Sequence, residues 1–236
     1  MGTHEMIVSS PNVTCLRVTS RAGRVEIFAE PRADFALLGD ATVGELLADG
    51  TLSVASASGS STIGVRCPVD SNVVVGTGSG NVVVSGRVGD LRATSSSGSI
   101  IVESARATDL RSESGKVRVA HCESGCRILT ASGAVQVGSV ASAEVATGSG
   151  KVDVASAAGK ARVRTASGSV DVGASGQGDI AIETMSGGVT VRLPAGTRPA
   201  AKLYAASGRT RCELAQGSDC TVAVRSMDGK IEVISA

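Results

Sequence analysis

The sequence predicts an all-β protein that folds as a single-stranded, right-handed parallel β-solenoid (β-helix) of about eleven rungs, each with 17–21 residues. Three observations predict this fold class. A Ser-Gly unit recurs at nearly constant spacing, apolar and polar residues alternate around each glycine, and aromatic residues make up only 1% of the chain. Because the apolar pattern has a period of two residues, it indicates strands rather than helices.

The repeated unit has the form apolar-x-apolar-x-x-x-Ser-Gly-x-Val-x-Val, as in residues 143–154 and 161–172. An earlier copy at residues 16–27 contains Gly23. The later glycines follow one another at intervals of 17 to 21 residues and are Gly59, Gly80, Gly98, Gly115, Gly133, Gly150, Gly168, Gly187, Gly208 and Gly229. We expect the chain to turn a corner at each glycine, with a positive φ wherever the turn requires it.

The alternation around each glycine predicts two short strands per unit, each with one buried face. A unit of this length cannot bury its own valines, whereas stacked units share a continuous interior ladder of parallel strands about 4.8 Å apart. Crossovers between parallel strands are nearly always right-handed, which predicts the hand of the coil. The only aromatic residues are Phe28, Phe35 and Tyr204, so the interior must be narrow and lined by small branched side chains.

Residues 31–51 break the repeat and carry Phe35, Leu37, Leu38, Leu46 and Leu47. They are interpreted as one irregular rung with a covering loop or hairpin. No low-complexity linker divides the chain, so we expect residues 1–236 to form a single β-solenoid domain.

Charge and hydropathy argue against nucleic-acid binding and against membrane insertion. A formal net charge of +1 gives no basic excess, so nucleic acid is not an expected partner. No apolar run approaches the ~20 residues of a membrane-spanning helix, so membrane insertion is not expected. Residues 1–20 show neither a signal peptide nor an anchor, which predicts a cytoplasmic protein for the chain as given.

Six cysteines occur without paired CxxC motifs, so we expect free thiols and neither a metal nor another cofactor. Cys122 and Cys126 lie in columns of inward-pointing residues and are interpreted as small core residues. A metal or redox site at this pair, with His121 and Glu123 beside it, is the alternative. His4 and His121 are the only histidines, which leaves little material for a Ser-His-Asp arrangement, and we expect no enzyme activity.

A weak charged ladder is predicted from Arg118, Asp153 and Asp171, which occupy the same outward column of the repeat. Carboxylates about 5 Å apart repel by about 1 kcal/mol in a water-like dielectric, a cost that a bound cation would relieve. Lys151, two residues before Asp153 on the same face, can compensate this charge without a metal.

A possible interaction surface consists of Val83 and Ile101, which point outward in adjacent rungs, with Val74 nearby on the preceding strand. The alternative is that Phe35, Leu37 or Leu46 of the irregular segment covers them. A second face carries several arginines interrupted by acids, and is interpreted as a solvated face with an anionic-ligand surface as the alternative. Its charged residues are Arg92, Arg111, Arg127, Arg162, Arg164, Arg225, Asp109, Glu144 and Glu183.

The units TASGSVDV, GSGNVVVSG and SSSGSIIV, entered through IGVRCPVDSNVVV at residues 63–75, resemble the bacterial putative-adhesin family of β-strand-repeat proteins of unknown function. The resemblance covers roughly residues 12–236. It implies a right-handed β-solenoid without a catalytic motif, and it implies a possible association with the cell envelope.

The leading functional hypothesis is a non-catalytic binding or adhesin-like module that presents flat solenoid faces to a protein or a surface polymer. A self-assembling structural scaffold, that is, a β-helical polymer, is the alternative, and a carbohydrate-active enzyme is the third hypothesis. If the last repeat stacked on the first, Lys230 would oppose Arg24 and Glu232 would oppose Glu26. Like charges in these positions are destabilising, which predicts a monomer or a small closed oligomer.

Overall fold

The structure, a computed structural model, describes residues 5–8, 13–39, 41–56 and 62–236, and for Glu5, residues 41–44 and Ser56 it describes the backbone only. Every regular element among the described residues is a β-strand. None of those residues forms a helix that is long and apolar enough to cross a membrane. The chain divides into two compact units, residues 1–119 and 120–236, with the boundary inside β11 (Val117–Ser132).

The strands of unit 1 are β1 (Glu5–Val8), β2 (Cys15–Ser20), β3 (Val25–Glu30), β4 (Phe35–Gly39), β5 (Ala41–Leu46), β6 (Thr51–Ser56), β7 (Ile63–Pro68), β8 (Asn72–Thr77), β9 (Val82–Ser95) and β10 (Ile100–Ser112). The strands of unit 2 are β12 (Val135–Ser149), β13 (Val152–Ala157), β14 (Ala161–Ser167), β15 (Val170–Ala174), β16 (Asp179–Ser186), β17 (Val189–Leu193), β18 (Pro199–Ser207), β19 (Thr210–Cys212), β20 (Cys220–Asp228) and β21 (Ile231–Ser235). Within each unit the strands form a solenoid-like sheet.

The interior is built from the apolar columns that the sequence predicts. In unit 2, Val145 of β12, Val163 of β14 and Ile182 of β16 are register partners in parallel strands, and each is at most 1% exposed. Burying one such side chain contributes about 1.5–3 kcal/mol. The alternating buried and exposed residues along each strand therefore supply the driving force for stacking.

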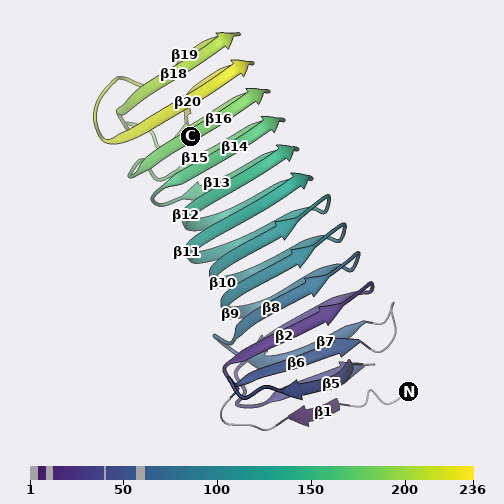
Figure 1. Cartoon of the computed structure of the whole chain (residues 1–236). Helices are drawn as coiled ribbons and strands as arrows, with labels where there is room; N and C mark the ends of the chain where they lie inside the picture. The colour runs from purple at the N-terminus through teal and green to yellow at the C-terminus, as the bar shows by residue number, and fades with distance from the viewer. Residues whose placement is uncertain (1–4, 9–12, 40, 57–61) are drawn as a thin grey trace. The chain divides into compact units, whose positions relative to one another are not determined.

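Unit 1 contains two ladders that share the long strands β9 and β10. One has the order β1, β4, β7, β3, β9, β10, and the other has the order β5, β6, β2, β8, β9, β10. Most pairs are parallel, but β1 with β4, β4 with β7, and β5 with β6 are antiparallel. The prediction of an entirely parallel solenoid is therefore wrong at this end, because the irregular segment at 31–51 runs back along β6 and β7 (Figure 1).

Unit 2 also has two ladders. One has the order β12, β14, β16, β20, β18, and the other has the order β12, β13, β15, β17, β21, β19. All of these pairs are parallel, and Figure 1 shows β20 between β16 and β18. The last repeat in the sequence is therefore internal, and β18 and β19 form the edge.

The first regular repeat is internal as well. β2 lies between β6 and β8, and β3 lies between β7 and β9. Arg24 and Glu26 are paired with each other at 2.8 Å, and so are Lys230 and Glu232 at 2.6 Å. The premise that these four residues lie at the ends of the stack is wrong, because the strands that carry them are flanked on both sides.

The corners of unit 2 explain the Ser-Gly signal. A buried Thr or Ser three residues before the glycine donates its hydroxyl to the carbonyl two residues ahead, as in Thr165 to Ser167 at 3.1 Å. Gly168 follows with φ of 127°, and a Cβ there would lie 2.1 Å from the carbonyl oxygen of Gly150. Only glycine fits this position, because both the backbone conformation and the neighbouring corner exclude a side chain.

Candidate functional site

The predicted interaction surface is only partly assembled. Val83 lies between Glu26 and Ile101 in register, and Ile101 is 42% exposed. Val74 lies on the other ladder, between Arg17 and Arg92. The structure therefore brings Val83 and Ile101 together but places Val74 among arginines on a different face.

The hydrophobic residues of the irregular segment lie elsewhere. Leu37 of β4 is the partner of Val65 in β7, and β3 separates β7 from Val83 in β9. Phe35 on the same strand is buried, whereas Leu46 at the end of β5 is 47% exposed. β4 and β5 extend the two ladders beyond β7 and β6, away from β10, and Ile101 is left exposed as a small apolar site.

The carboxylates of the predicted charged ladder are paired with basic side chains on the same face. Asp153 and Asp171 are register partners in β13 and β15. Lys151 Nζ lies 3.8 Å from Asp153 Oδ2, and an Arg192 nitrogen donates to Asp171 Oδ2 at 2.5 Å. Arg118 belongs to unit 1. No group of three or more metal-ligating side chains occurs within the described ranges.

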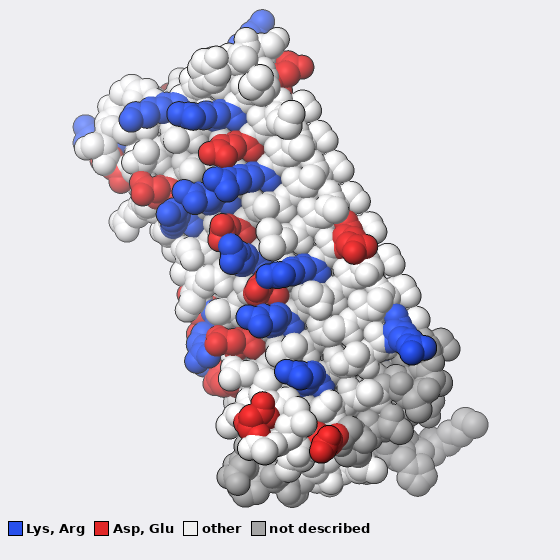
Figure 2. Space-filling view, in the orientation of Figure 1, with Lys and Arg blue, Asp and Glu red and all other residues white. Residues whose placement is uncertain are grey.

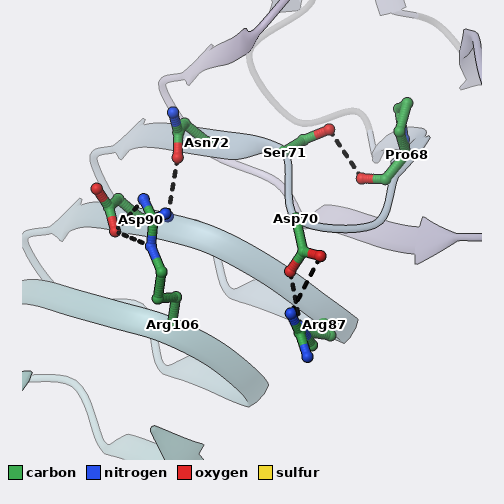
Figure 3. Close-up of polar contacts among 7 residues, drawn as sticks. All are labelled: Pro68, Asp70, Ser71, Asn72, Arg87, Asp90 and Arg106. Atoms are coloured by element: carbon green, nitrogen blue, oxygen red, sulfur yellow. Dashed lines mark hydrogen bonds and ion pairs between the residues drawn. The ribbon is translucent and has the colours of Figure 1, made fainter. Parts of the chain in front are cut away.

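A polar corner of unit 1, not anticipated from the sequence, lies where the chain passes from β7 to β8 (Figure 3). Asp70, at φ of 62°, accepts hydrogen bonds from Arg87 Nε at 2.7 Å and Nη2 at 3.1 Å. Arg106 Nε donates to Asp90 Oδ1 at 3.0 Å, and the Asp90 amide donates to Asn72 Oδ1 at 3.0 Å. Ser71 Oγ donates to the carbonyl of Pro68 at 2.8 Å.

These contacts have a structural role. They connect the Pro68–Asn72 reversal to the middle parts of the paired strands β9 and β10. Both carboxylates are engaged by arginines, and the groups are about half exposed, so each pair contributes little to stability. The Asp and Asn that favour such turns were present in the sequence, but their partners depend on which strands become neighbours.

Four of the six cysteines are buried, whereas Cys15 and Cys212 are partly exposed. Cys122 and Cys126 are buried, as predicted, and Cys122 Sγ lies 3.3 Å from the carbonyl oxygen of Gly125. Burial raises the pKa of the Cys67 thiol to about 11, and burial also raises the pKa of Cys220, with Asp219 contributing. None of the six cysteines forms a disulfide bond.

A different surface in unit 2 combines exposed apolar and basic side chains. On β16, β20 and β18, outward positions alternate along each strand and align across the ladder. The three rows are Ala181, Glu183 and Met185; Ala223, Arg225 and Met227; and Lys202, Tyr204 and Ala206. Thr184 pairs with Ser226, and Ser186 pairs with Asp228, so Met185 and Met227 are neighbours.

Three large apolar side chains on this grid face solvent: Met185 is 63%, Met227 61% and Tyr204 61% exposed. We call these three residues the Tyr–Met patch. Tyr204 is the register partner of Arg225, and Tyr204, Lys202 and Arg225 line a shallow pocket of about 460 Å³. The sequence did not reveal the patch, because it exists only when β20 lies between β16 and β18.

Basic side chains border the patch. Arg164 is paired with Glu183 at 3.1 Å, whereas Lys202 and Arg225 form no ion pair with any residue that the structure describes. Figure 2 shows Lys and Arg side chains interspersed with Asp and Glu along this face. The two methionines therefore align at one end of the three strands, whereas Arg225 and Lys202 lie at outward positions before that end, with Glu183 beside Arg225.

The fold and this surface define a β-solenoid-like repeat protein with open, solvent-facing ladders. The chain belongs to the Toastrack DUF4097 family, whose profile matches residues 3–233. This confirms the predicted putative-adhesin family of unknown function. No curated protein matches the sequence significantly.

Solved structures of similar fold come from two Parabacteroides species. A putative adhesin from Parabacteroides distasonis is 11% identical, with a TM-score of 0.65, and the match covers 99% of this chain and 97% of that chain. A putative adhesin from Parabacteroides merdae is 9% identical, with a TM-score of 0.61, and the match covers 98% and 96% of the two chains. At these identities the likeness shows the shared fold.

Proposed function

We propose that this protein is a non-catalytic, adhesin-like module that binds another protein through the Tyr–Met patch and the basic residues beside it. The observation that carries the proposal is the exposure of the neighbouring Met185 and Met227, with exposed Tyr204 diagonal to Met227 on the next strand. Tyr, Met and Arg are enriched in protein–protein interfaces, and contiguous exposed apolar residues mark contact surfaces. Methionine also adapts its shape to a partner.

A protein partner is favoured over a polysaccharide. Sugar recognition relies on aromatic stacking platforms, and the whole chain has only one tyrosine, two phenylalanines and no tryptophan. Two thioethers next to a phenol suit the apolar side chains of a protein. Lys202 and Arg225 would then face acidic residues at the rim of the partner's surface.

We further propose that the protein acts as one domain whose stacked strands coil with right-handed crossovers in about eleven rungs. The parallel register of most ladders supports this geometry. A binding role rather than a catalytic one is supported by the pairing of Asp70, Asp90 and Asp171 with arginines, which occupies these carboxylates.

Affinity capture with matched variants tests the proposed function. The immobilised protein, the variant Met185→Glu/Met227→Glu, and the control Ser156→Glu/Ala158→Glu are incubated with an extract of the cells that produce the protein, and bound proteins are quantified by mass spectrometry. Ser156 in β13 and Ala158 just after it are exposed, so the control adds the same charge elsewhere. We expect partners that bind wild type and control to be depleted at least about tenfold on the patch variant. Equal capture by all three proteins contradicts the proposal.

A further inference from the structure

The edge strand β18 has an unpaired side. β18 pairs only with β20 among the described strands, and the neighbouring β19 pairs only with β21. The Ala201 amide donates to Gln216 Oε1 at 3.4 Å, which identifies it as a group directed away from β20. Because backbone groups alternate in direction along a strand, the amides of Leu203 and Ala205 point to the same free side.

The interior is also incomplete at this edge. Val222 and Val224 of β20 are fully buried, whereas their register partners Ala201 and Leu203 are only half-buried. One more strand beside β18 would cover Leu203 and satisfy the free backbone groups. Within the described residues, the segment from Glu213 to Asp219 reaches Ala201 through Gln216 but forms no hydrogen bond with Leu203 or Ala205.

The charge of the edge selects among possible occupants. Lys202 is exposed and forms no ion pair with the described residues, and exposed Arg209 follows at the corner after β18. A second copy of this chain would bring another Lys202 and Arg209 to the same place, where like charges are destabilising. An acidic strand is attracted there, and its outward side chains would adjoin Tyr204.

We propose that the free side of β18 binds an extended acidic segment of the partner protein by strand addition. The segment pairs with residues 202–207, a length of about 20 Å. Its apolar side chains alternate with carboxylates, so that one set covers Leu203 and Ala205 while the other set faces Lys202. This inference rests on the proposed function, because the added strand extends the same outward face that carries the Tyr–Met patch.

Short peptides test the binding mode directly. The probe is a blocked, fluorescently labelled octapeptide that alternates glutamate and valine, and its binding to the intact protein is followed by fluorescence anisotropy. The control octapeptide has the same composition in two blocks, four glutamates and then four valines. We expect the alternating peptide to bind at least about tenfold more tightly than the block peptide, because only alternation separates the acidic from the apolar face. Equal affinities, or no binding of either peptide, overturn the proposal.

Backbone methylation and a charge variant identify the contact. Methylating either all valine amides or all glutamate amides removes the hydrogen-bond donors of one strand edge, so one of the two peptides should lose binding and the other should retain it. Lys202→Glu should weaken binding at least about tenfold. Lys160→Glu should leave binding within twofold, because Lys160 immediately precedes β14, which is three strands away from β18 in the same ladder. Retained binding by both methylated peptides, or equal effects of the two charge variants, excludes strand addition at β18.

The two proposals fail in distinguishable ways. If the peptides do not bind but Met185→Glu/Met227→Glu still loses its captured partner, strand addition is wrong and the proposed function stands. If the alternating peptide binds as expected but the patch variant captures the same proteins as wild type, the β18 site stands and the proposed role of the Tyr–Met patch is wrong.

Discussion

Ile182 pairs with Val224 in the interior of unit 2, although the strand that contains Leu203 lies between them in the sequence. Val224 is fully buried between its neighbours, and Leu203 is half-buried at the edge. The C-terminal repeat is thus held on both sides instead of being left at a free end.

This strand order predicts that two similar substitutions to alanine destabilise the protein by different amounts. Val224→Ala should lower the free energy of unfolding by about 1.5–2.5 kcal/mol, because it leaves a cavity in a closed part of the core. Leu203→Ala should cost less than about 1 kcal/mol, although it removes more atoms, because the leucine is partly solvated. Urea denaturation of both variants measures the difference. A larger loss for Leu203→Ala would contradict the internal position of β20.

Two glycine-to-alanine variants separate the energetic cost of backbone strain from the cost of steric crowding at the corners. Gly168 and Gly196 both have positive φ, but a Cβ at Gly196 would meet no atom within 4 Å. Gly196→Ala should therefore cost about 1 kcal/mol, from conformation alone. Gly168→Ala should cost at least about 2 kcal/mol more, because it collides with Gly150. Equal urea midpoints for the two variants would show that the corners do not stack as closely as described.

Cys67 gives the stability of the protein a pH dependence in the alkaline range. Its folded-state pKa is about 11, against 9.0 for an ordinary thiol, because burial disfavours the thiolate. The folded protein therefore holds this proton more tightly than the unfolded chain. The resulting stabilisation, on the order of 2 kcal/mol, is complete below pH 9 and is lost as the pH rises towards 11. The urea midpoint of Cys67→Ala should fall less than that of wild type between pH 9 and 11. Parallel curves would contradict the assignment.

The oligomeric state that we expect depends on the exposed edge strands β18 and β19, because the first and last repeats are internal. Lys202, Arg209 and Arg211 lie along this edge, Arg211 in an ion pair with Glu213 at 3.1 Å, and charged residues on an edge strand oppose pairing with another copy. We expect the untagged protein to be a monomer or a small closed oligomer at moderate salt. Replacing the three cations with valine should produce larger species. Light scattering and negative-stain microscopy check both statements, and long filaments of the wild type would support the scaffold alternative.

The sequence predicted the inward columns but not the order of the strands. Val163 and Ile182 could be placed inside because the two-residue period of apolar side chains determines which face is buried. The same period occurs in every repeat, so either Leu203 or Val224 fits beside Ile182, and the pattern does not distinguish the two arrangements. The position of β20 depends on the chain's path through the irregular segment 213–219.

The same degeneracy explains why the candidate site was missed. Met185 and Met227 occupy equivalent outward positions in their repeats, but whether they touch depends on strand order. Sequence reasoning instead selected Val83 and Ile101, whose repeats are adjacent in both sequence and space. Antiparallel pairing of β4 with β7 was also not predicted, because residues 31–51 lack the repeat from which register was inferred.

The central claim is that a protein partner binds the Tyr–Met patch, and the most direct test is the dissociation constant of the captured partner for wild type, Tyr204→Ala and Ser156→Ala. Isothermal titration calorimetry with purified proteins provides this measurement. Tyr204→Ala should weaken binding at least about 30-fold, equivalent to about 2 kcal/mol, because it removes the largest side chain of the patch. Ser156→Ala should change the dissociation constant by less than about twofold. A dissociation constant for Tyr204→Ala equal to that of wild type would contradict the proposed binding surface.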